Sequence, residues 1–258
     1  MAIENIDLIC EIAIGAGMEI MDVYKKDFTV EYKDDKSPLT EADIRANNYI
    51  TRELNKLTPD IPILSEESKM IPYSERKFWN SFWLVDPVDG TKEFIKKSDE
   101  FTVNIALIQK GKPVLGVVYA PALDELYFGS TTHAATKKQN QVTKKLPLKK
   151  EDDSIIKVVA SKSHLTPETS AFIEKIAQES GKKTELTSRG SSLKLCMVAE
   201  GSAHIYPRLG PTMEWDTAAA HAVVNAAGKR VIATDGINET GELLYNKEDL
   251  LNPWFIVK

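Results

Sequence analysis

The sequence predicts a mixed fold of the α/β (α+β) class, in which helices accompany an antiparallel sheet first and alternate with strands later. Three observations predict it. Residues 4–26 and 40–57 carry apolar side chains at helical spacing. Residues 101–108 alternate with strand periodicity, and residues 113–119 return as a second strand after a Lys-Gly-Lys turn. Beyond residue 150, short apolar strands and helices take turns, which is typical of an α/β arrangement.

The expected elements of the first half follow a simple order. A helix over 4–26 leads to a short strand over 28–32 and to a second amphipathic helix over 40–57, which Pro59 and Pro62 end. Two short apolar segments, 61–64 and 82–85, each run into a group of acidic residues. The strands at 101–108, 113–119 and 126–128 form the antiparallel sheet.

The most polar stretch of the chain, residues 137–153, contains six lysines followed by three acidic residues. We expect a solvated connection there in preference to a site for a polyanion, and we divide the chain into an N-terminal lobe, 1–150, and a C-terminal lobe, 151–258. The second lobe is predicted to hold strands at 155–160, 184–187, 203–206, 229–233 and 254–257, and helices at 167–178, 192–200 and 215–227.

Bulk properties restrict the function. The chain has 258 residues, 42% of them hydrophobic, which is enough for a substantial core, and no stretch reaches the ~20 apolar residues of a membrane span. The N-terminus lacks the pattern of a signal peptide. A net charge of -5 argues against a nucleic-acid partner. Cys10 and Cys196 are expected to be buried thiols, which is typical of a reducing compartment. We therefore expect a cytoplasmic monomer or homodimer, with peripheral contact at the inner face of the membrane left open.

The decisive chemical feature is DPVDGT, residues 86–91, which an apolar strand delivers. Asp86 and Asp89 at a strand end can converge on one point, and hard cations such as Mg²⁺ take such oxygen ligands. Gly90 permits a close approach of the backbone. A helix that begins after Asp89 would offer its free N–H groups to an anion. The same hexapeptide is also compatible with an ordinary turn, because Asp-Pro and Asp-Gly pairs are common turn formers.

Other hydrolase motifs do not match. The HAD phosphatase motif places its two aspartates two residues apart, whereas Asp86 and Asp89 are three apart. There is no P-loop, no zinc-like spacing of cysteine and histidine, and no Gly-x-Ser-x-Gly elbow.

Three further acidic segments accompany DPVDGT. Glu66 and Glu67 follow the apolar segment 61–64, Asp43 stands three residues after Thr40 at a helix start, and Asp216 lies in the first turn of a predicted helix. Each has a plain structural explanation, namely an exposed turn, a capping box and a favourable contact with the helix dipole.

Together the four segments resemble the inositol monophosphatase superfamily of lithium-sensitive, magnesium-dependent phosphatases, in the right order and over nearly the whole chain. Lys92-Glu93-Phe94 and the following EFTVNIAL, residues 100–107, resemble the 3′(2′),5′-bisphosphate nucleotidase branch, whereas the inositol branch typically carries Thr-Asn-Phe at 92–94. The resemblance implies a layered αβαβα sandwich of the inositol monophosphatase and sugar phosphatase type, with metals between the two lobes.

The resemblance also implies roles for individual residues. Asp43 and Thr91 would orient and help deprotonate the attacking water, and Glu67 would lie just behind the metal ligands. The metal ligands would be Glu66, Asp86, Asp89, Asp216 and the Val88 carbonyl. The residues expected to face the substrate are Glu66, Val88, Asp89, Gly90, Thr91, His164, Ser192, Lys194, Arg208 and Asp216.

The expected reaction is the hydrolysis of adenosine 3′,5′-bisphosphate to AMP and phosphate, which clears a by-product of sulfate assimilation; the sulfated nucleotide is an open second substrate. Two or three Mg²⁺ ions would neutralise the phosphate, activate a water and stabilise the leaving oxygen, so no protein nucleophile is needed. An inositol-1-phosphatase or broad sugar-phosphatase of the same superfamily is the alternative. A non-catalytic, metal-binding regulatory protein is a more distant one.

Overall fold

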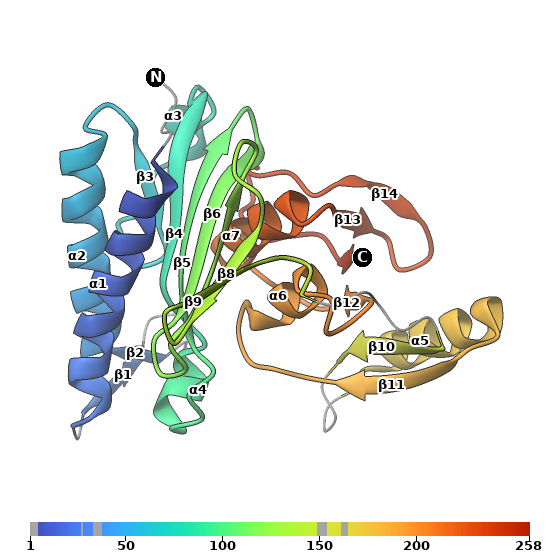
Figure 1. The fold of residues 1–258 in the computed structure, drawn as a ribbon. Helices are drawn as coiled ribbons and strands as arrows, with labels where there is room; N and C mark the ends of the chain where they lie inside the picture. Colours follow the sequence, from blue (N-terminus) through green and yellow to red (C-terminus); the bar gives the residue numbers. More distant parts are fainter. Residues whose placement is uncertain (1–4, 27, 33–37, 149–153, 161–164) are drawn as a thin grey trace.

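The computed structural model describes residues 5–26, 28–32, 38–148, 154–160 and 165–258. Its elements stack as helices, sheet, helices, sheet and helix, from α1 and α2 at one side to α5 at the other (Figure 1). The predicted mixed fold and its αβαβα layering are confirmed.

The first layer is the helix pair α1 (Ile6–Tyr24) and α2 (Glu41–Leu57). Both helices turn an apolar face to the sheet, on which Ile9, Ile20 and Ile50 are fully buried. A two-stranded antiparallel sheet, β1 (Val30–Tyr32) and β2 (Pro38–Thr40), joins them.

The second layer is a seven-stranded sheet of order β3-β4-β5-β6-β7-β8-β9. The predicted antiparallel sheet forms its centre, but β3 pairs with β4 in parallel, with a short helix α3 (Tyr73–Arg76) in the crossover. The strands are β3 (Ile63–Ser65), β4 (Ser81–Asp89), β5 (Thr102–Gln109), β6 (Lys112–Ala120), β7 (Glu125–Ser130), β8 (Thr136–Gln139) and β9 (Val142–Lys145).

The prediction of a solvated connection at 137–153 was right about exposure, since all four residues of β9 are exposed, but wrong about form, because β8 and β9 make a hairpin at the sheet edge. The Lys137 ammonium lies 3.4 Å from Glu125 and 3.2 Å from Glu200, and only 13% of its side chain is exposed. The edge strand is β9, which ends in Lys144 and Lys145. Edge strands often carry lysines, which deter pairing with other chains, so the composition of β9 resembles that of a loop. Residues 149–153 lie outside the described part.

The third layer consists of α6 (Leu193–Ala199) and α7 (Glu214–Ala226). Alanines dominate the buried side of α7, so the helix lies very close to the sheet. A Cβ on Gly116 of β6 would stand 2.1 Å from the Ala219 carbonyl oxygen, so only glycine fits there.

The fourth layer is an antiparallel sheet of order β12-β15-β13-β14, made of β12 (Tyr206–Arg208), β15 (Phe255–Val257), β13 (Val231–Thr234) and β14 (Glu239–Glu242). The strand predicted at 203–206 begins later than expected, and β14 was not predicted because all four of its residues are exposed. Outside it, β10 (Ile155–Val159) pairs in parallel with β11 (Lys183–Thr187), and α5 (Pro167–Ser180) connects them.

Two hydrophobic cores hold the layers together. One lies between α1, α2 and the large sheet, and the other joins the opposite face of that sheet to α6, α7 and the second sheet. The second core uses residues from both sides of residue 150, and the division into lobes at that point stays a prediction. Cys10 and Cys196 are buried free thiols, as expected. No helix in the described ranges combines the length and apolarity that crossing a bilayer requires.

Candidate active site

Parallel pairing of β3 and β4 brings the first two acidic segments together. Ser65 and Val85 are partners in the register, and the N–H of Glu66 donates to the Val85 carbonyl at 3.2 Å. Since β3 and β4 run parallel in this register, Glu66 directly after β3 lies beside Asp86 of β4.

A β-bulge places Asp86 and Asp89 on the same face of β4. Asp86 pairs with Asn104 and Asp89 with Thr102, so three steps on β4 oppose two on β5. In a regular strand, residues three apart point to opposite faces, and one extra residue restores the common face. Pro87 is tolerated here because the bulge does not need its missing N–H.

The other two acidic residues cap helices. Asp43 Oδ2 accepts from the Thr40 N–H at 2.8 Å and from the Thr40 hydroxyl at 2.6 Å, which confirms the predicted capping box of α2. Asp216 Oδ2 accepts from the Met213 N–H at 2.8 Å at the start of α7. Both carboxylates are therefore oriented by the backbone of their own helix.

The acidic side chains influence one another strongly. Burial raises the pKa of Asp86 well above its ordinary value, and the charge of Glu66 raises it further, followed by Asp89, Asp216 and Asp43. Burial and the charge of Asp89 raise the pKa of Asp216 to about 7. Such a group binds protons, or a cation, that relieve its repulsion.

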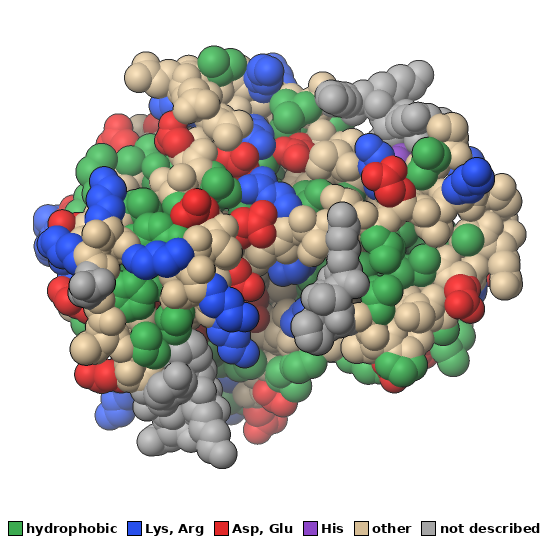
Figure 2. Space-filling view, turned by 90° about the horizontal axis from the view of Figure 1, so that it is seen from below, with side chains coloured by type: hydrophobic (Ala, Val, Ile, Leu, Met, Phe, Trp, Pro, Cys, Tyr) green, Lys and Arg blue, Asp and Glu red, His purple; other side chains and the backbone are tan. Residues whose placement is uncertain are grey.

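These residues fit a hard divalent cation by their chemistry, because all of them supply carboxylate oxygen and neither sulfur nor imidazole is among them. No three acidic, histidine or cysteine side chains of the described ranges are already gathered as a group of metal ligands. The site is thus a set of carboxylates that interact through their charges. Figure 2, which looks at the molecule from the side on which α4 (Thr91–Ile95) lies, shows acidic and basic side chains along the hollow between its two halves.

The segment before α6 contacts Asp89 directly. The Ser192 hydroxyl lies 2.6 Å from Asp89 Oδ2, and the Ser191 hydroxyl donates to the Asp89 carbonyl at 2.7 Å. Ser191 itself has a φ of 56°, in the left-handed region. The second half of the chain therefore touches the site formed by the first half.

A cationic pocket adjoins the acidic group. Lys194 and Arg208 line a cavity of about 270 Å³ together with Tyr206. Burial lowers the pKa of Lys194, the charge of Asp89 opposes this shift, and the charge of Arg208 adds to it. Arg208 Nη2 donates to a backbone carbonyl, whereas its buried Nε has no hydrogen-bond partner among the described residues. This pocket is suited to an anion.

Two predicted positions are less defined. His164 lies outside the described residues, as do its neighbours 161–163. Thr91 directly follows Gly90, whose φ of 93° needs glycine. The Thr91 hydroxyl donates to the Val88 carbonyl at 3.3 Å. The pairing of Thr91 with Asp43 stays a prediction.

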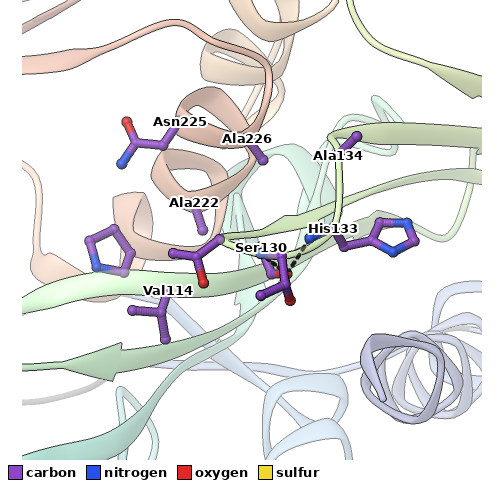
Figure 3. A pocket seen from close by; sticks show the side chains of 10 residues that line it. Val114, Ser130, His133, Ala134, Ala222, Asn225 and Ala226 are labelled. Atoms are coloured by element: carbon purple, nitrogen blue, oxygen red, sulfur yellow. Dashed lines mark hydrogen bonds between the residues drawn. The ribbon is translucent and has the colours of Figure 1, made fainter. Parts of the chain in front are cut away.

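A larger cavity, of about 450 Å³, lies elsewhere. It is bordered by Val114, Ser130 and His133 from the strand ends and by Ala222 and Asn225 of α7 (Figure 3). Its residues stand where β6 begins, at the opposite end of the sheet from the start of β5 at the acidic group. With no lysine, arginine or acidic side chain in its lining, it does not suit phosphate chemistry.

Comparison with known proteins agrees with the geometry. A family model described as "Inositol monophosphatase family" matches residues 3–253. The chain belongs to the inositol monophosphatase family. Members of this family are metal-dependent phosphatases.

Individual relatives of the family cover nearly the full length. The "3'(2'),5'-bisphosphate nucleotidase CysQ" of Salmonella typhimurium is 46% identical, with 98% of each chain covered. The protein of the same name from Escherichia coli K12 has the same identity and coverage. A crystal structure of CysQ from Bacteroides thetaiotaomicron superposes with a TM-score of 0.87 at 45% identity, covering 98% of this chain and 96% of that one.

Reasoning from sequence missed several polar residues around this inositol monophosphatase family site. Asn104 donates to Ser192 at 2.7 Å, and Arg189 and Glu100 hold the segment before Ser191. A signal for Asn104 existed, since it is a polar residue in the middle of an otherwise apolar strand. Arg189 gave none, and the EFTVNIAL segment that begins with Glu100 gave no sign of this contact, because the two residues meet only through the tertiary fold.

Proposed function

We propose that this protein is a 3′(2′),5′-bisphosphate nucleotidase that hydrolyses adenosine 3′,5′-bisphosphate to AMP and phosphate. The observation that carries the proposal is the acidic group around Asp86 next to the cationic pocket of Lys194 and Arg208. The CysQ relatives, which match over 98% of the chain, bear the name of this activity.

For the acidic group we propose a magnesium site that holds two or three ions. Bound Mg²⁺ would neutralise the phosphate, lower the pKa of a water and stabilise the leaving oxygen. Its proposed ligands are Glu66, Asp86, Asp89, Asp216 and the Val88 carbonyl. The mutual repulsion of the four carboxylates supports this assignment, because a bound cation relieves it without protonating them.

Asp43 and Thr91 are the proposed pair that orients the attacking water and accepts its proton. The capping bonds of Asp43 from Thr40 fix its carboxylate at the start of α2, so it needs no reorganisation during the reaction. Gly90 and Thr91 are proposed to offer backbone N–H groups to the phosphate that is cleaved.

Substrate choice follows from the second phosphate. Lys194 and Arg208 would pair with the phosphate that is not cleaved, and the Nε of Arg208, which has no partner among the described residues, would gain an acceptor. An inositol monophosphate has no second phosphate for this pocket. Ser192 is only 2% exposed, so the structure favours Lys194 and Arg208 as the nucleotide contacts of these segments. We place the enzyme in the cytoplasm, where its buried thiols stay reduced.

The test compares phosphate release from adenosine 3′,5′-bisphosphate and from inositol 1-phosphate in Mg²⁺, with and without Li⁺. We expect a strong preference for the nucleotide, inhibition by Li⁺, and no activity in excess chelator. A preference for the inositol ester would keep the metal site and overturn the substrate assignment. Full activity in chelator would overturn the mechanism.

A variant pair sharpens the substrate test. Lys194→Ala should raise KM for the bisphosphate more than for inositol 1-phosphate, because only the first has a phosphate for the pocket. The exposed Lys175 on α5 provides the control, and Lys175→Ala should leave both values unchanged. Equal effects of Lys194→Ala on the two substrates would refute the assignment.

A further inference from the structure

Ser192 stands where three parts of the chain meet. Its hydroxyl lies 2.6 Å from Asp89 Oδ2 on β4, 2.7 Å from Asn104 Nδ2 on β5 and 3.1 Å from the Asp216 carbonyl on α7. The residue is 2% exposed, so these three polar groups occupy its surroundings.

The chemistry of its neighbours fixes the direction of these hydrogen bonds. Asn104 Nδ2 also lies 3.4 Å from Asp89 Oδ2, a carboxylate oxygen that only accepts, so the amide nitrogen of Asn104 faces Ser192 and Asp89. An amide nitrogen only donates; the Ser192 oxygen therefore accepts from it and keeps its single proton for another partner. The Asp89 carboxylate is closer than the Asp216 carbonyl and carries charge, which makes it the stronger acceptor.

We propose that Ser192 is a positioning residue, which together with Asn104 holds Oδ2 of Asp89 and fixes the orientation of that carboxylate. The adjoining Ser191 secures the same residue by its main-chain carbonyl. Asp89 is thus held at both its backbone and its side chain by one segment of the second half of the chain. The inference rests on the proposed assignment of Asp89 to the cation.

This role differs from the nucleotide contact expected for Ser192. A hydroxyl that accepts from Asn104 and donates to Asp89 has no proton left for a phosphate. Removal of Ser192 should therefore weaken the binding of a divalent cation, even in the absence of any nucleotide. Loss of a group that orients a metal ligand typically weakens metal affinity about 10–100-fold.

The primary test is titration of the full chain with Mn²⁺, followed by electron paramagnetic resonance, without nucleotide. Ser192→Ala should raise the dissociation constant of Mn²⁺ about tenfold or more. Ser192→Cys keeps the side-chain volume with a weaker donor and should give a smaller increase. Ser202 is the matched control. Its hydroxyl also donates to a carboxylate, Glu200 Oε1, at 2.7 Å, but this carboxylate is not one of the proposed metal ligands. Ser202→Ala should leave Mn²⁺ binding unchanged.

Kinetics separate positioning from nucleotide contact. At saturating metal, Ser192→Ala should lower kcat and leave KM for adenosine 3′,5′-bisphosphate within about twofold, since a metal ligand acts mainly on the chemical step. An unchanged Mn²⁺ affinity in both Ser192 variants, with a raised KM, would overturn the proposal and assign Ser192 to the nucleotide. If the wild-type chain does not hydrolyse the bisphosphate, the proposed function fails, and the Mn²⁺ titration still decides the role of Ser192. If Ser192→Ala does not fold, Ser192→Cys decides it.

Discussion

The Arg189 guanidinium donates to Glu125 Oε2 at 2.7 Å and ties the segment 190–192 to strand β7 of the large sheet. Only 19% of the Arg189 side chain and 10% of the Glu125 side chain are exposed. Burial by itself would raise the pKa of Glu125, but the hydrogen bond and charge of Arg189 hold it below its ordinary value. Glu100 accepts from Arg189 and from the Gly190 N–H, so the loop is anchored both to the start of β7 and to the segment just before β5, at the same end of the sheet.

The two side chains of this pair should be coupled: the double variant should lose less stability than the sum of the losses in the two single variants. Arg189→Met removes the closest cation of the largely buried Glu125 carboxylate and leaves Lys137 3.4 Å away, at a cost of about 2 kcal/mol in the free energy of unfolding. In the double variant with Glu125→Gln the carboxylate that lost this partner is gone, so we expect a coupling energy of about 1–3 kcal/mol. Urea unfolding of the wild type, both single variants and the double variant measures it. Additive costs would show that the two side chains do not stabilise the loop through each other.

His221 predicts how stability depends on pH. Burial lowers the pKa of His221 to about 3, with a further contribution from Lys112, and its Nδ1 lies 2.9 Å from the Tyr245 hydroxyl. In the unfolded chain the pKa of the ring is near its ordinary value of 6.5. The unfolded state therefore binds a proton that the folded state does not, and stability falls as the pH drops from 6.5 towards 3.

The slope is about 1.4 kcal/mol per pH unit, so about 2 kcal/mol of the free energy of unfolding should be lost between pH 6.5 and pH 5. His221→Phe keeps an aromatic ring and cannot titrate, so its loss over the same range should be smaller by that amount. Unfolding of both proteins in excess Mg²⁺ at several pH values checks this. Parallel profiles would mean that His221 is already charged in the folded state.

The acidic site residues were predictable because each stands at a marked end of an element. Asp86 follows an apolar strand, Asp43 lies three residues after the N-cap Thr40, and Asp216 lies in the first turn of a helix. Their proximity was not predictable from such local signals. It depends on the parallel pairing of β3 with β4 and on the bulge after Asp86, which are both non-local features.

The layers of the fold were predicted from periodicity, which reports burial on one face. Periodicity fails where burial depends on a partner far along the chain, as for Lys137, Glu125 and Glu200, whose charges are buried only because they meet. In the sequence, Lys137 therefore looked like part of a polar connection. The resemblance to a family supplied the αβαβα layering, and the local patterns alone did not.

Asp86 predicts a conflict between stability and function. Burial, and then repulsion from the neighbouring acids, raises the pKa of Asp86, so both disfavour its charged carboxylate in the folded chain without cation. Asp86→Asn removes one charge and keeps an oxygen that accepts from the Val88 N–H, as Asp86 Oδ1 does at 3.1 Å. In chelator we expect the melting temperature to rise by about 2–4 °C, which corresponds to about 1 kcal/mol.

The same variant should lose phosphatase activity and the rise in melting temperature that Mn²⁺ causes in the wild type. Differential scanning calorimetry with chelator and with Mn²⁺ measures both shifts. The control is Asp235, an exposed residue whose carboxylate accepts from the Ile237 N–H in the same turn. Asp235→Asn should keep the response to Mn²⁺. A full response to Mn²⁺ in Asp86→Asn would contradict its assignment as a ligand.

Gly90 and Gly181 separate backbone strain from damage to the site. Both glycines have a left-handed φ, 93° and 66°, so alanine is strained at either position by about 1–2 kcal/mol. A Cβ on Gly181 would meet nothing within 4 Å, whereas a Cβ on Gly90 would stand 3.1 Å from the Ser191 hydroxyl.

Because that hydroxyl holds the Asp89 carbonyl, Gly90→Ala should displace a site residue as well as strain the turn. We expect both variants to lower the free energy of unfolding, Gly90→Ala by more, and only Gly90→Ala to lower kcat, by about tenfold or more. Urea unfolding and phosphate release, measured on the same two proteins, check this. Equal losses of stability with normal kcat in both would show that Ser191 can move aside without disturbing Asp89, and that glycine is needed at position 90 for its φ alone.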